Sequence, residues 1–289
     1  MNTVCKTIPQ DPQVPDWGSL ELAPTWADEL DLTRPSGLWR FFKALQGERQ
    51  RVEVDREHAL FRSIPKYALQ EFHSLPNGNY SSKIARGYIT GFDRAMLGHM
   101  HRIRSEIASR VADCEAVLDL GTGGGKLAAA VKRLGVADVW GADVSPYLLK
   151  HAATDYPEVN FIQSPAESLP FNNERFDAVV VSFLLHEMPP KYARQALAEA
   201  YRVLRPGGRL LITEPSENQL KPVKLSNLLR PAGWRHLYFK SLADRVHEPF
   251  VMAWHQLDKP AAFAEAGFTL DQHRDDIPIN FYSLKKCSA

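Results

Sequence analysis

The chain has 289 residues, of which 44% are hydrophobic, so it can build the core of one large domain or two small ones. Its 35 basic and 34 acidic residues nearly cancel, which argues against a general attraction to nucleic acid or to an anionic membrane. The three cysteines, Cys5, Cys114 and Cys287, lie far apart without metal-type spacing. We therefore expect free thiols in a reducing compartment and no metal site.

The first residues lack the basic start and apolar run of a secretory signal, and no stretch reaches the roughly 18 apolar residues that span a bilayer. These features predict a cytoplasmic protein without a membrane span. Prolines at positions 9, 12 and 15 predict a flexible tail over residues 1–18.

Residues 19–112 are predicted to form a helical N-terminal domain that covers the substrate. Between Ser82 and Val111, apolar residues recur every three or four positions, which predicts one amphipathic helix packed on the following domain. The polar residues of this region are interpreted as surface or packing residues rather than as a metal or nucleic-acid site. They are His58, His73, His99, His101, Arg102, Arg104 and Arg110.

From residue 113 to residue 289, short apolar runs alternate with helical segments, which is typical of an α/β domain with a parallel sheet covered on both faces. Five such units are followed by two final strands. The loose stretch at about 216–255 is too long for an ordinary connection, so we expect a helical insertion over the site there.

One stretch, VLDLGTGGG at residues 117–125, combines an apolar run, an acidic residue and clustered glycines before a helical segment. Glycine permits positive φ and leaves no Cβ in the way, so a ligand can lie against the backbone where a helix begins. This pattern suits a nucleotide-like cofactor, although a purely structural turn is the alternative.

The next apolar run ends at Asp143. In open α/β sheets ligands bind beyond the carboxyl ends of the strands, where an acid can accept hydrogen bonds from the two ribose hydroxyls. The alternative is that Asp143 caps the following helix, but Ser145 and Pro146 already supply a cap and a first turn. We therefore expect Asp143 to bind ribose.

Five segments, VLDLGTGGG, GADVS, AESLPF, FDAVVVSFLLHEM and RVLRPGGRLLITEP, stand in an order and spacing that resemble class I S-adenosylmethionine-dependent methyltransferases. They are most similar to the branch that includes the ubiquinone and menaquinone biosynthesis C-methyltransferases. The resemblance covers about residues 115–215. It implies a Rossmann-like, seven-stranded, mostly parallel sheet with helices on both faces, joined to the N-terminal helical domain.

The resemblance also implies S-adenosylmethionine as methyl donor and S-adenosylhomocysteine as product. The acidic-glycine motif would approach the methionyl part, the acid of GADVS the ribose, and the AESLPF segment the adenine edge. The end of the fourth run would lie near the methyl donor. The implied cofactor-binding residues are Asp119, Gly121, Thr122, Gly123, Gly125, Asp143, Val144, Ala166, Glu167, Ser182 and Phe183.

The chain departs from the family at Pro165, where an aspartate commonly accepts from the adenine amino group. Proline cannot make that contact, so either Glu167 or a main-chain carbonyl must replace it.

Few catalytic side chains are expected, because methyl transfer from an activated sulfonium depends chiefly on positioning and on excluding water. His186 follows the fourth run and is the candidate general base, or else a residue that shapes the pocket.

Aromatic residues of the N-terminal helices and of the insertion favour a small, apolar or aromatic acceptor that receives the methyl on oxygen, carbon or nitrogen. Nucleic-acid acceptors are disfavoured, and a monomer or homodimer is expected. Two alternatives remain: a module that binds S-adenosylmethionine without turnover, and a nicotinamide-dependent oxidoreductase. Against the second, GTGGGK has a lysine where the third glycine of G-x-G-x-x-G belongs.

Overall fold

The computed structural model describes residues 11–287 apart from residues 50, 56, 224, 225, 227 and 228. Cys5 and most of the expected tail therefore lie outside the described residues. Cys114 and Cys287 are free thiols, as the sequence predicts. In the part of the chain that is described, no helix is long and apolar enough to cross a bilayer.

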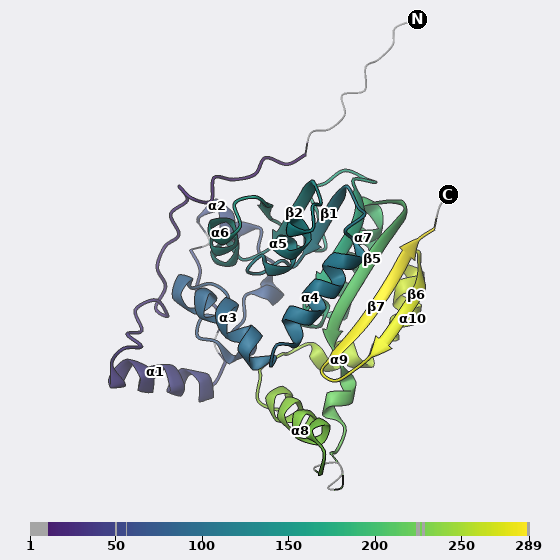
Figure 1. Cartoon of the computed structure of the whole chain (residues 1–289). Coiled ribbons are helices and arrows are strands. Elements are labelled where there is room, and N and C mark those ends of the chain that lie inside the picture. Colours follow the sequence, from purple (N-terminus) through teal and green to yellow (C-terminus); the bar gives the residue numbers. More distant parts are fainter. Residues whose placement is uncertain (1–10, 50, 56, 224–225, 227–228, 288–289) are drawn as a thin grey trace, which may run out of the picture.

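A single seven-stranded sheet in the order β3-β2-β1-β4-β5-β7-β6 forms the centre of the molecule (Figure 1). Only β7 runs against its neighbours, so the predicted fold class is confirmed. The strands are β1 (Ala116–Leu120), β2 (Asp138–Asp143), β3 (Asn160–Gln163), β4 (Phe176–Ser182), β5 (Leu204–Pro215), β6 (Phe268–Asp275) and β7 (Ile279–Lys286).

Strand register places the candidate residues beside one another. Leu120, the last residue of β1, pairs with Ala142 of β2 on one side and with Val181 of β4 on the other. Because the three strands are parallel, their carboxyl ends meet at one edge of the sheet. The glycine turn, Asp143 and Ser182 therefore all emerge at this edge.

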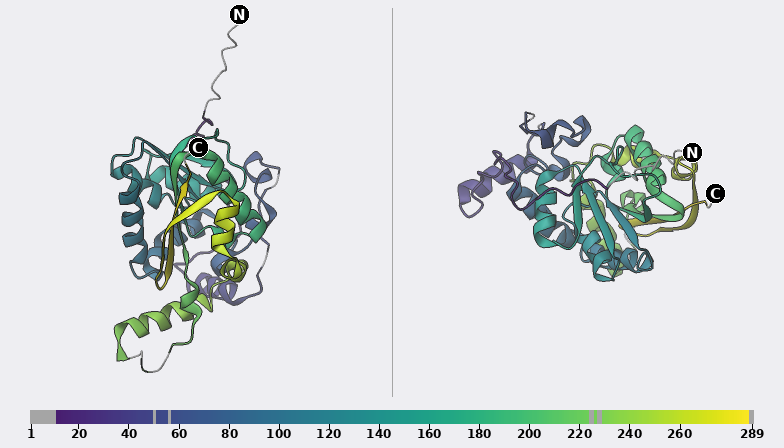
Figure 2. Two further views of the ribbon diagram at one scale, coloured as in Figure 1. Left: turned by 90° about the vertical axis from the view of Figure 1, so that its right-hand side faces the viewer. Right: turned by 90° about the horizontal axis from the view of Figure 1, so that it is seen from above.

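Helices cover both faces of the sheet (Figure 2). Buried side chains of α4, α5 and α6 form one core with inward residues such as Val117 and Val180, while those of α7, α9 and α10 form the other core with Leu118 and Val179. These helices are α4 (His99–Arg110), α5 (Lys126–Arg133), α6 (Pro146–Asp155), α7 (Pro190–Val203), α9 (Val251–Gln256) and α10 (Lys259–Glu265).

The amphipathic stretch from Ser82 to Val111 is not one helix, which corrects the sequence prediction. It divides into α3 (Ser82–Ala95) and α4 because Leu97 and Gly98 both adopt positive φ, at 48° and 78°. A left-handed pair cannot continue a right-handed helix, so the chain turns there. The apolar stripe nevertheless packs on the sheet domain as expected, since Met100 and Ile107 lie in the same core as Leu127.

The N-terminal region wraps around the sheet domain. Trp17, within the segment expected to be flexible, is buried, and its Nε1 donates a hydrogen bond to the carbonyl of Phe161 on β3 at 2.9 Å. This contact places the start of the packed chain before residue 18. The region also contains α1 (Pro35–Gln46), α2 (Ala59–Arg62), η1 (Lys66–Ala68) and η2 (Phe72–Ser74).

Residues 216–255 hold η4 (Glu217–Leu220), α8 (Pro231–Ala243) and α9. Helices α1 and α8 project from the lower edge of the molecule (Figure 1), the edge at which the parallel strands end. The site thus lies between the sheet and segments from both ends of the chain.

Candidate functional site

Asp119 anchors the glycine turn through hydrogen bonds of its carboxylate. Its Oδ2 accepts hydrogen bonds from Thr122 Oγ1 at 2.7 Å and from the backbone N–H of Ala128 in α5 at 3.0 Å. Burial of the carboxyl raises its pKa to about 7, against the effect of these two hydrogen bonds. One side chain therefore joins β1, the turn and the first turn of α5.

The backbone of the turn is exposed to the site at Gly123. This residue has a φ of +53°, and a Cβ added there would meet nothing within 4 Å among the described residues. At Gly124, by contrast, a Cβ would come within 2.6 Å of Ile89 Cγ1. Gly124 is thus required by packing against α3, whereas Gly123 leaves open space that a ligand can fill.

Asp143 lies at the end of β2, with its carboxylate facing the glycine turn. Oδ2 accepts from the N–H of Gly123 at 2.9 Å, and Oδ1 accepts from the N–H of Ser145 at 2.9 Å. Burial raises the pKa of Asp143 to about 6, opposed by these two hydrogen bonds. Ser145 itself caps α6 through Leu148, as predicted, so Asp143 is not needed as the helix cap.

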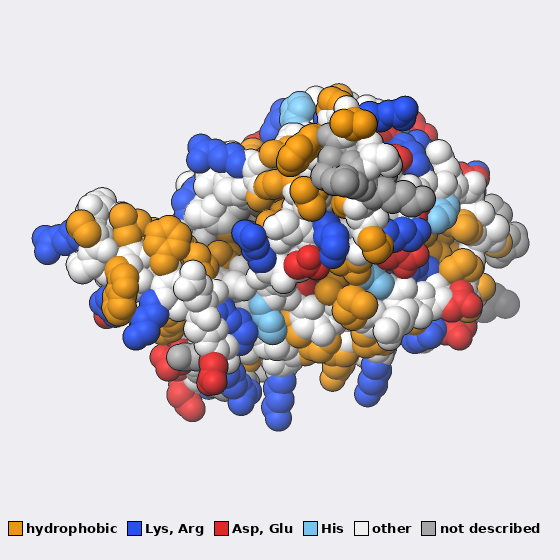
Figure 3. Space-filling model, turned by 90° about the horizontal axis from the view of Figure 1, so that it is seen from below, with side chains coloured by type: hydrophobic (Ala, Val, Ile, Leu, Met, Phe, Trp, Pro, Cys, Tyr) orange, Lys and Arg blue, Asp and Glu red, His pale blue; other side chains and the backbone are white. Residues whose placement is uncertain are grey.

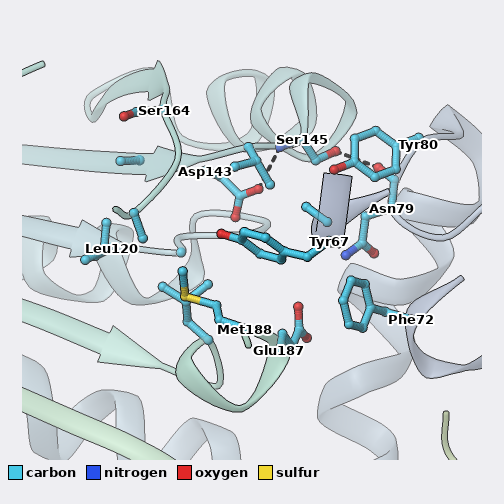
Figure 4. A pocket seen from close by; sticks show the side chains of 16 residues that line it. Tyr67, Phe72, Asn79, Tyr80, Leu120, Asp143, Ser145, Ser164, Glu187 and Met188 are labelled. Atoms are coloured by element: carbon cyan, nitrogen blue, oxygen red, sulfur yellow. Dashed lines mark hydrogen bonds between the residues drawn. The ribbon is translucent and has the colours of Figure 1, made fainter. Parts of the chain in front are cut away.

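A first cavity adjoins Asp143 (Figure 4). Tyr67 crosses this cavity, with Asp143 on one side and Glu187 and Met188 on the other. Its remaining walls are largely apolar and come from both the N-terminal region and the sheet edge. They include Phe72, Tyr80, Leu120, Val144, Ala166 and Leu184.

A second cavity, which Asp143 also lines, runs along the glycine turn. At its wall, Asp93 of α3 accepts from Arg104 Nη2 and from Lys126 Nζ, both at 2.8 Å. The sequence assigned Arg104 to a solvated face; the structure corrects this, because Arg104 lines the cavity. This cluster places two cations and one carboxylate where a ligand with a zwitterionic end would fit.

Two N-terminal residues that the sequence did not single out complete the first cavity. Tyr67 donates a hydrogen bond from its hydroxyl to Glu167 Oε2 at 2.8 Å. Asn79 lines both cavities, and its buried Oδ1 has no hydrogen-bond partner in the described structure. An unpaired buried acceptor is costly, so Asn79 Oδ1 marks a position where a ligand donor would be stabilising.

We expect Tyr67→Phe to weaken cofactor binding by more than tenfold, because the lost hydrogen bond to a carboxylate is worth ~1.5–3 kcal/mol and closes one wall of the cavity. Tyr192→Phe is the matched control, since the two rings pack with centroids 4.7 Å apart but the Tyr192 hydroxyl has no hydrogen-bond partner among the described residues. Titration calorimetry measures both. Equal affinities for the two variants would contradict the closing role of Tyr67.

A third cavity, larger than the first two, opens between α1, α3 and α8 and is lined mainly by apolar side chains. An aromatic wall separates it from the second cavity. His73 stacks on Tyr88 with ring centroids 4.9 Å apart, Tyr88 contacts Phe92 at 5.5 Å, and Phe92 contacts Phe183 at 5.5 Å. Tyr88, Phe92 and Phe183 line both cavities, which therefore adjoin at this wall.

His73 and Glu248 provide a polar edge in the apolar cavity. His73 Nε2 lies 3.2 Å from Glu187 Oε1 and 3.7 Å from Glu248 Oε1, while its Nδ1 is buried without a described partner. Burial alone would lower the pKa of His73, but Glu187 and Glu248 raise it above its usual value. These contacts favour a cationic His73 with one N–H left free.

His186, the histidine that the sequence singled out, lies behind this edge. It is fully buried and does not line any of the three cavities; its Nδ1 lies 2.5 Å from Glu214 Oε2. Glu214 also accepts from the N–H of Leu185 at 2.7 Å. Burial would lower the pKa of His186, yet Glu214 and Glu248 raise it well above its usual value. This position favours the pocket-shaping alternative over a base that touches the acceptor.

Most of the residues implied by the resemblance come together at the sheet edge, but three do not line the cavities. Gly125 begins α5, where a Cβ would meet Phe161 at 2.8 Å, so its role is packing. Glu167 is engaged by Tyr67, and His186 is enclosed. Those that line the first two cavities are Asp119, Gly121, Thr122, Gly123, Asp143, Val144, Ala166, Ser182 and Phe183.

A Rossmann-like sheet with a glycine turn and a half-buried acid at the next strand end is typical of a site of the nucleoside-binding type. A family model described as a methyltransferase domain matches residues 118–212. A Yersinia enterocolitica protein named ubiquinone/menaquinone biosynthesis C-methyltransferase UbiE is 32% identical over 187 residues, covering 59% of this chain and 70% of the relative. The Chlorobaculum tepidum demethylmenaquinone methyltransferase is 37% identical over 99 residues, which are 34% of this chain and 40% of that protein.

The fold has a solved counterpart in Haloferax volcanii, in the complex between the Trm112 methyltransferase activator and a methyltransferase. It covers 70% of this chain and 96% of the solved chain at a TM-score of 0.50 and 17% identity. The chain spans about half the length of the first curated relatives it matches. It belongs to the class I S-adenosylmethionine-dependent methyltransferases and is similar to their ubiquinone and menaquinone biosynthesis branch.

Proposed function

We propose that this chain transfers a methyl group from S-adenosylmethionine to a small, largely apolar aromatic acceptor that carries an oxygen substituent. The observation that carries the proposal is the aromatic wall of Tyr88, Phe92 and Phe183. It lies between a polar cavity along the glycine turn and a large apolar cavity. This arrangement offers one compartment to a nucleoside-like donor and an adjoining one to an apolar acceptor.

The residues present fit S-adenosylmethionine. Gly123 leaves a space free of side chains, and Asn79 Oδ1 is a buried acceptor in need of a donor. Asp143 would accept from the ribose hydroxyls and the first cavity would enclose the adenine. The Asp93, Arg104 and Lys126 cluster would receive the amino-acid end. With Pro165 in place of the usual acid and Glu167 already paired to Tyr67, the adenine amino group would be met by main-chain carbonyls.

Bound S-adenosylmethionine supplies an already activated methyl group, so the protein has to position the acceptor and exclude water. The half-buried aromatic wall at the junction of the two cavities would limit access of water there. His73 would donate from Nδ1 to the oxygen of the acceptor and stabilise negative charge there. Glu187 and Glu248 lie beside Nε2, at the other edge of the imidazole. His186, which is paired with Glu214, contacts Glu248 in turn. His186 is thus proposed as a positioning residue.

The names of these relatives favour a carbon of a quinol-type ring as the methylated atom. The test is incubation of the purified protein with S-adenosylmethionine and three acceptors: a reduced naphthoquinone with a short prenyl chain, a simple phenol and an amine. Mass spectrometry should detect a methylated ring product with the first acceptor, and NMR should place the methyl on carbon. A methylated amine with no ring product would contradict the proposed acceptor.

Calorimetry distinguishes the proposed function from the two alternatives, a non-catalytic binding module and a nicotinamide-dependent oxidoreductase. Absence of binding by S-adenosylmethionine and S-adenosylhomocysteine at millimolar concentration would refute the proposed function. Binding without transfer to any acceptor would favour a non-catalytic module, and preferential binding of a nicotinamide cofactor would favour an oxidoreductase.

A further inference from the structure

Most of the large hydrophobic side chains that are exposed in the described chain gather on α1 and around α8, at the lower edge of the molecule. Trp39 is 64% exposed, Trp234 is 60% exposed and Leu229 is 88% exposed. Single exposed apolar residues are ordinary, but a cluster that includes two tryptophans marks an interaction surface. We call this surface the docking face; its apolar residues are Leu38, Trp39, Phe42, Leu229, Trp234, Leu237, Tyr238 and Met252.

The docking face is also basic, although the whole chain is balanced at 35 basic and 34 acidic residues. Neither α1 nor α8 contains an acidic residue, and both begin after an arginine. Arg34 and Lys240 are paired with Asp31 and Asp244. The remaining cations have no acidic partner in the described structure; they are Arg40, Lys43, Arg230 and Arg235.

The third cavity opens at this face. Phe41 of α1 and Phe239 and Leu242 of α8 line it, so the exposed residues on the same two helices flank its mouth. Figure 3 shows this side of the molecule, with patches of hydrophobic side chains and, between them, Lys and Arg side chains together with a smaller number of Asp and Glu side chains. A molecule that enters the cavity therefore passes between α1 and α8.

We propose that the docking face binds the surface of an anionic lipid bilayer and brings the mouth of the apolar cavity against it. Basic residues combined with exposed Trp, Phe and Leu are the composition of helices that lie in the headgroup region. A second copy docked through the same face would place like charges opposite each other, which disfavours a symmetric dimer. Lys43 lies over the ring of Trp39 at 5.1 Å, so the two groups reach the same level of the surface.

The purpose of this surface rests on the proposed function: an apolar acceptor that resides in a bilayer could enter the cavity without crossing water. The binding itself does not depend on catalysis. It is therefore tested without methyl donor or acceptor, so that failure of either proposal leaves the other standing.

The experiment is co-sedimentation of the full chain with vesicles of phosphatidylcholine alone or with roughly 30% phosphatidylglycerol. We expect binding to the anionic vesicles that weakens with salt. The double variant Trp39→Ala/Phe42→Ala should bind at least about tenfold more weakly. Arg40→Glu/Arg235→Glu should lose most of the preference for anionic vesicles. All four side chains are exposed, so the variants should keep the wild-type melting temperature.

Leu134→Ala/Leu270→Ala is the matched control, because these leucines are 48% and 40% exposed at the end of α5 and on β6. It should bind vesicles like the wild type. Absence of binding to anionic vesicles would overturn the proposal, as would equal losses in the control and in Trp39→Ala/Phe42→Ala. A dimer in light scattering that Trp39→Ala/Phe42→Ala converts to a monomer, without vesicle binding, would overturn it in favour of a second copy.

Discussion

Replacing Asp143 by alanine is expected to weaken binding of S-adenosylhomocysteine by more than tenfold. The carboxylate would accept hydrogen bonds from the ribose, and hydrogen bonds to a charged group are worth ~1.5–3 kcal/mol. The variant also releases the N–H groups of Gly123 and Ser145, which loosens the backbone at the same end of the site. Titration calorimetry gives the affinity directly.

Asp138→Ala is the control for this variant, because Asp138 begins the same strand, pairs with Arg175 and lies at the opposite edge of the sheet. Its affinity for the cofactor should match that of the wild type. If Asp143→Ala binds S-adenosylhomocysteine as tightly as the wild type does, Asp143 orders the backbone of the turn but does not bind the ribose.

The pH dependence of the same affinity tests the charge of Asp143. Burial raises its pKa to about 6 in the free protein, and donors from a ligand would favour the ionised form. Affinity should therefore fall as the pH drops below about 6, by up to about tenfold per unit. Asp143→Asn keeps an acceptor oxygen but cannot ionise, so its affinity should lack this slope.

The first four strands were predictable from sequence because each is a short apolar run whose central residues are buried. All five residues of β1 are buried, for example, and the polar Asp119 among them is explained by its bonds to the turn and to α5. Local pattern therefore sufficed for the glycine turn and for Asp143. The same pattern could not reveal the break at Leu97 and Gly98, because apolar periodicity continues across a left-handed pair.

The polar edge of the third cavity was missed because it depends on contacts between residues far apart in sequence. His73 belongs to the N-terminal region, Glu187 follows β4 and Glu248 follows α8. The backbone at His73 is left-handed, with a φ of 57°, and it sets the direction of the side chain. The apolar periodicity of the sequence gives no information about that direction. The clustered turn residues of HSLPNG were the only local signal for such a bend.

His186 illustrates the reverse case, in which sequence position was informative and side-chain direction was not. Phe183 adopts a φ of 58° directly after β4, and the chain then enters the short helix η3 (Leu185–Glu187). This turn sends His186 toward Glu214 on the neighbouring strand, while Phe183 and Glu187 face the cavities. Phe183 and Glu187, which lie close to His186 in sequence, therefore line the second cavity instead of His186.

Replacing His73 by asparagine is expected to lower kcat about 100-fold, since a preorganised donor to developing negative charge contributes on this scale. Asparagine tolerates the left-handed backbone at this position, so the turn is retained. Affinity for S-adenosylhomocysteine should stay within twofold, because His73 lines the apolar cavity and not the two cofactor cavities. The rate is measured with the acceptor methylated best by the wild type. A kcat within threefold of the wild type would contradict the role of His73.

His101→Asn is the control, because His101 is exposed on α4. The pH profile then distinguishes a donor from a base. Glu187 and Glu248 raise the pKa of His73, with His186 acting in the opposite sense. A donating imidazolium is lost as the pH rises through that raised pKa, so the rate of the wild type relative to His73→Asn should decline toward alkaline pH. A ratio that grows with pH would instead identify His73 as a base, because a base must be neutral before it can take a proton from the acceptor.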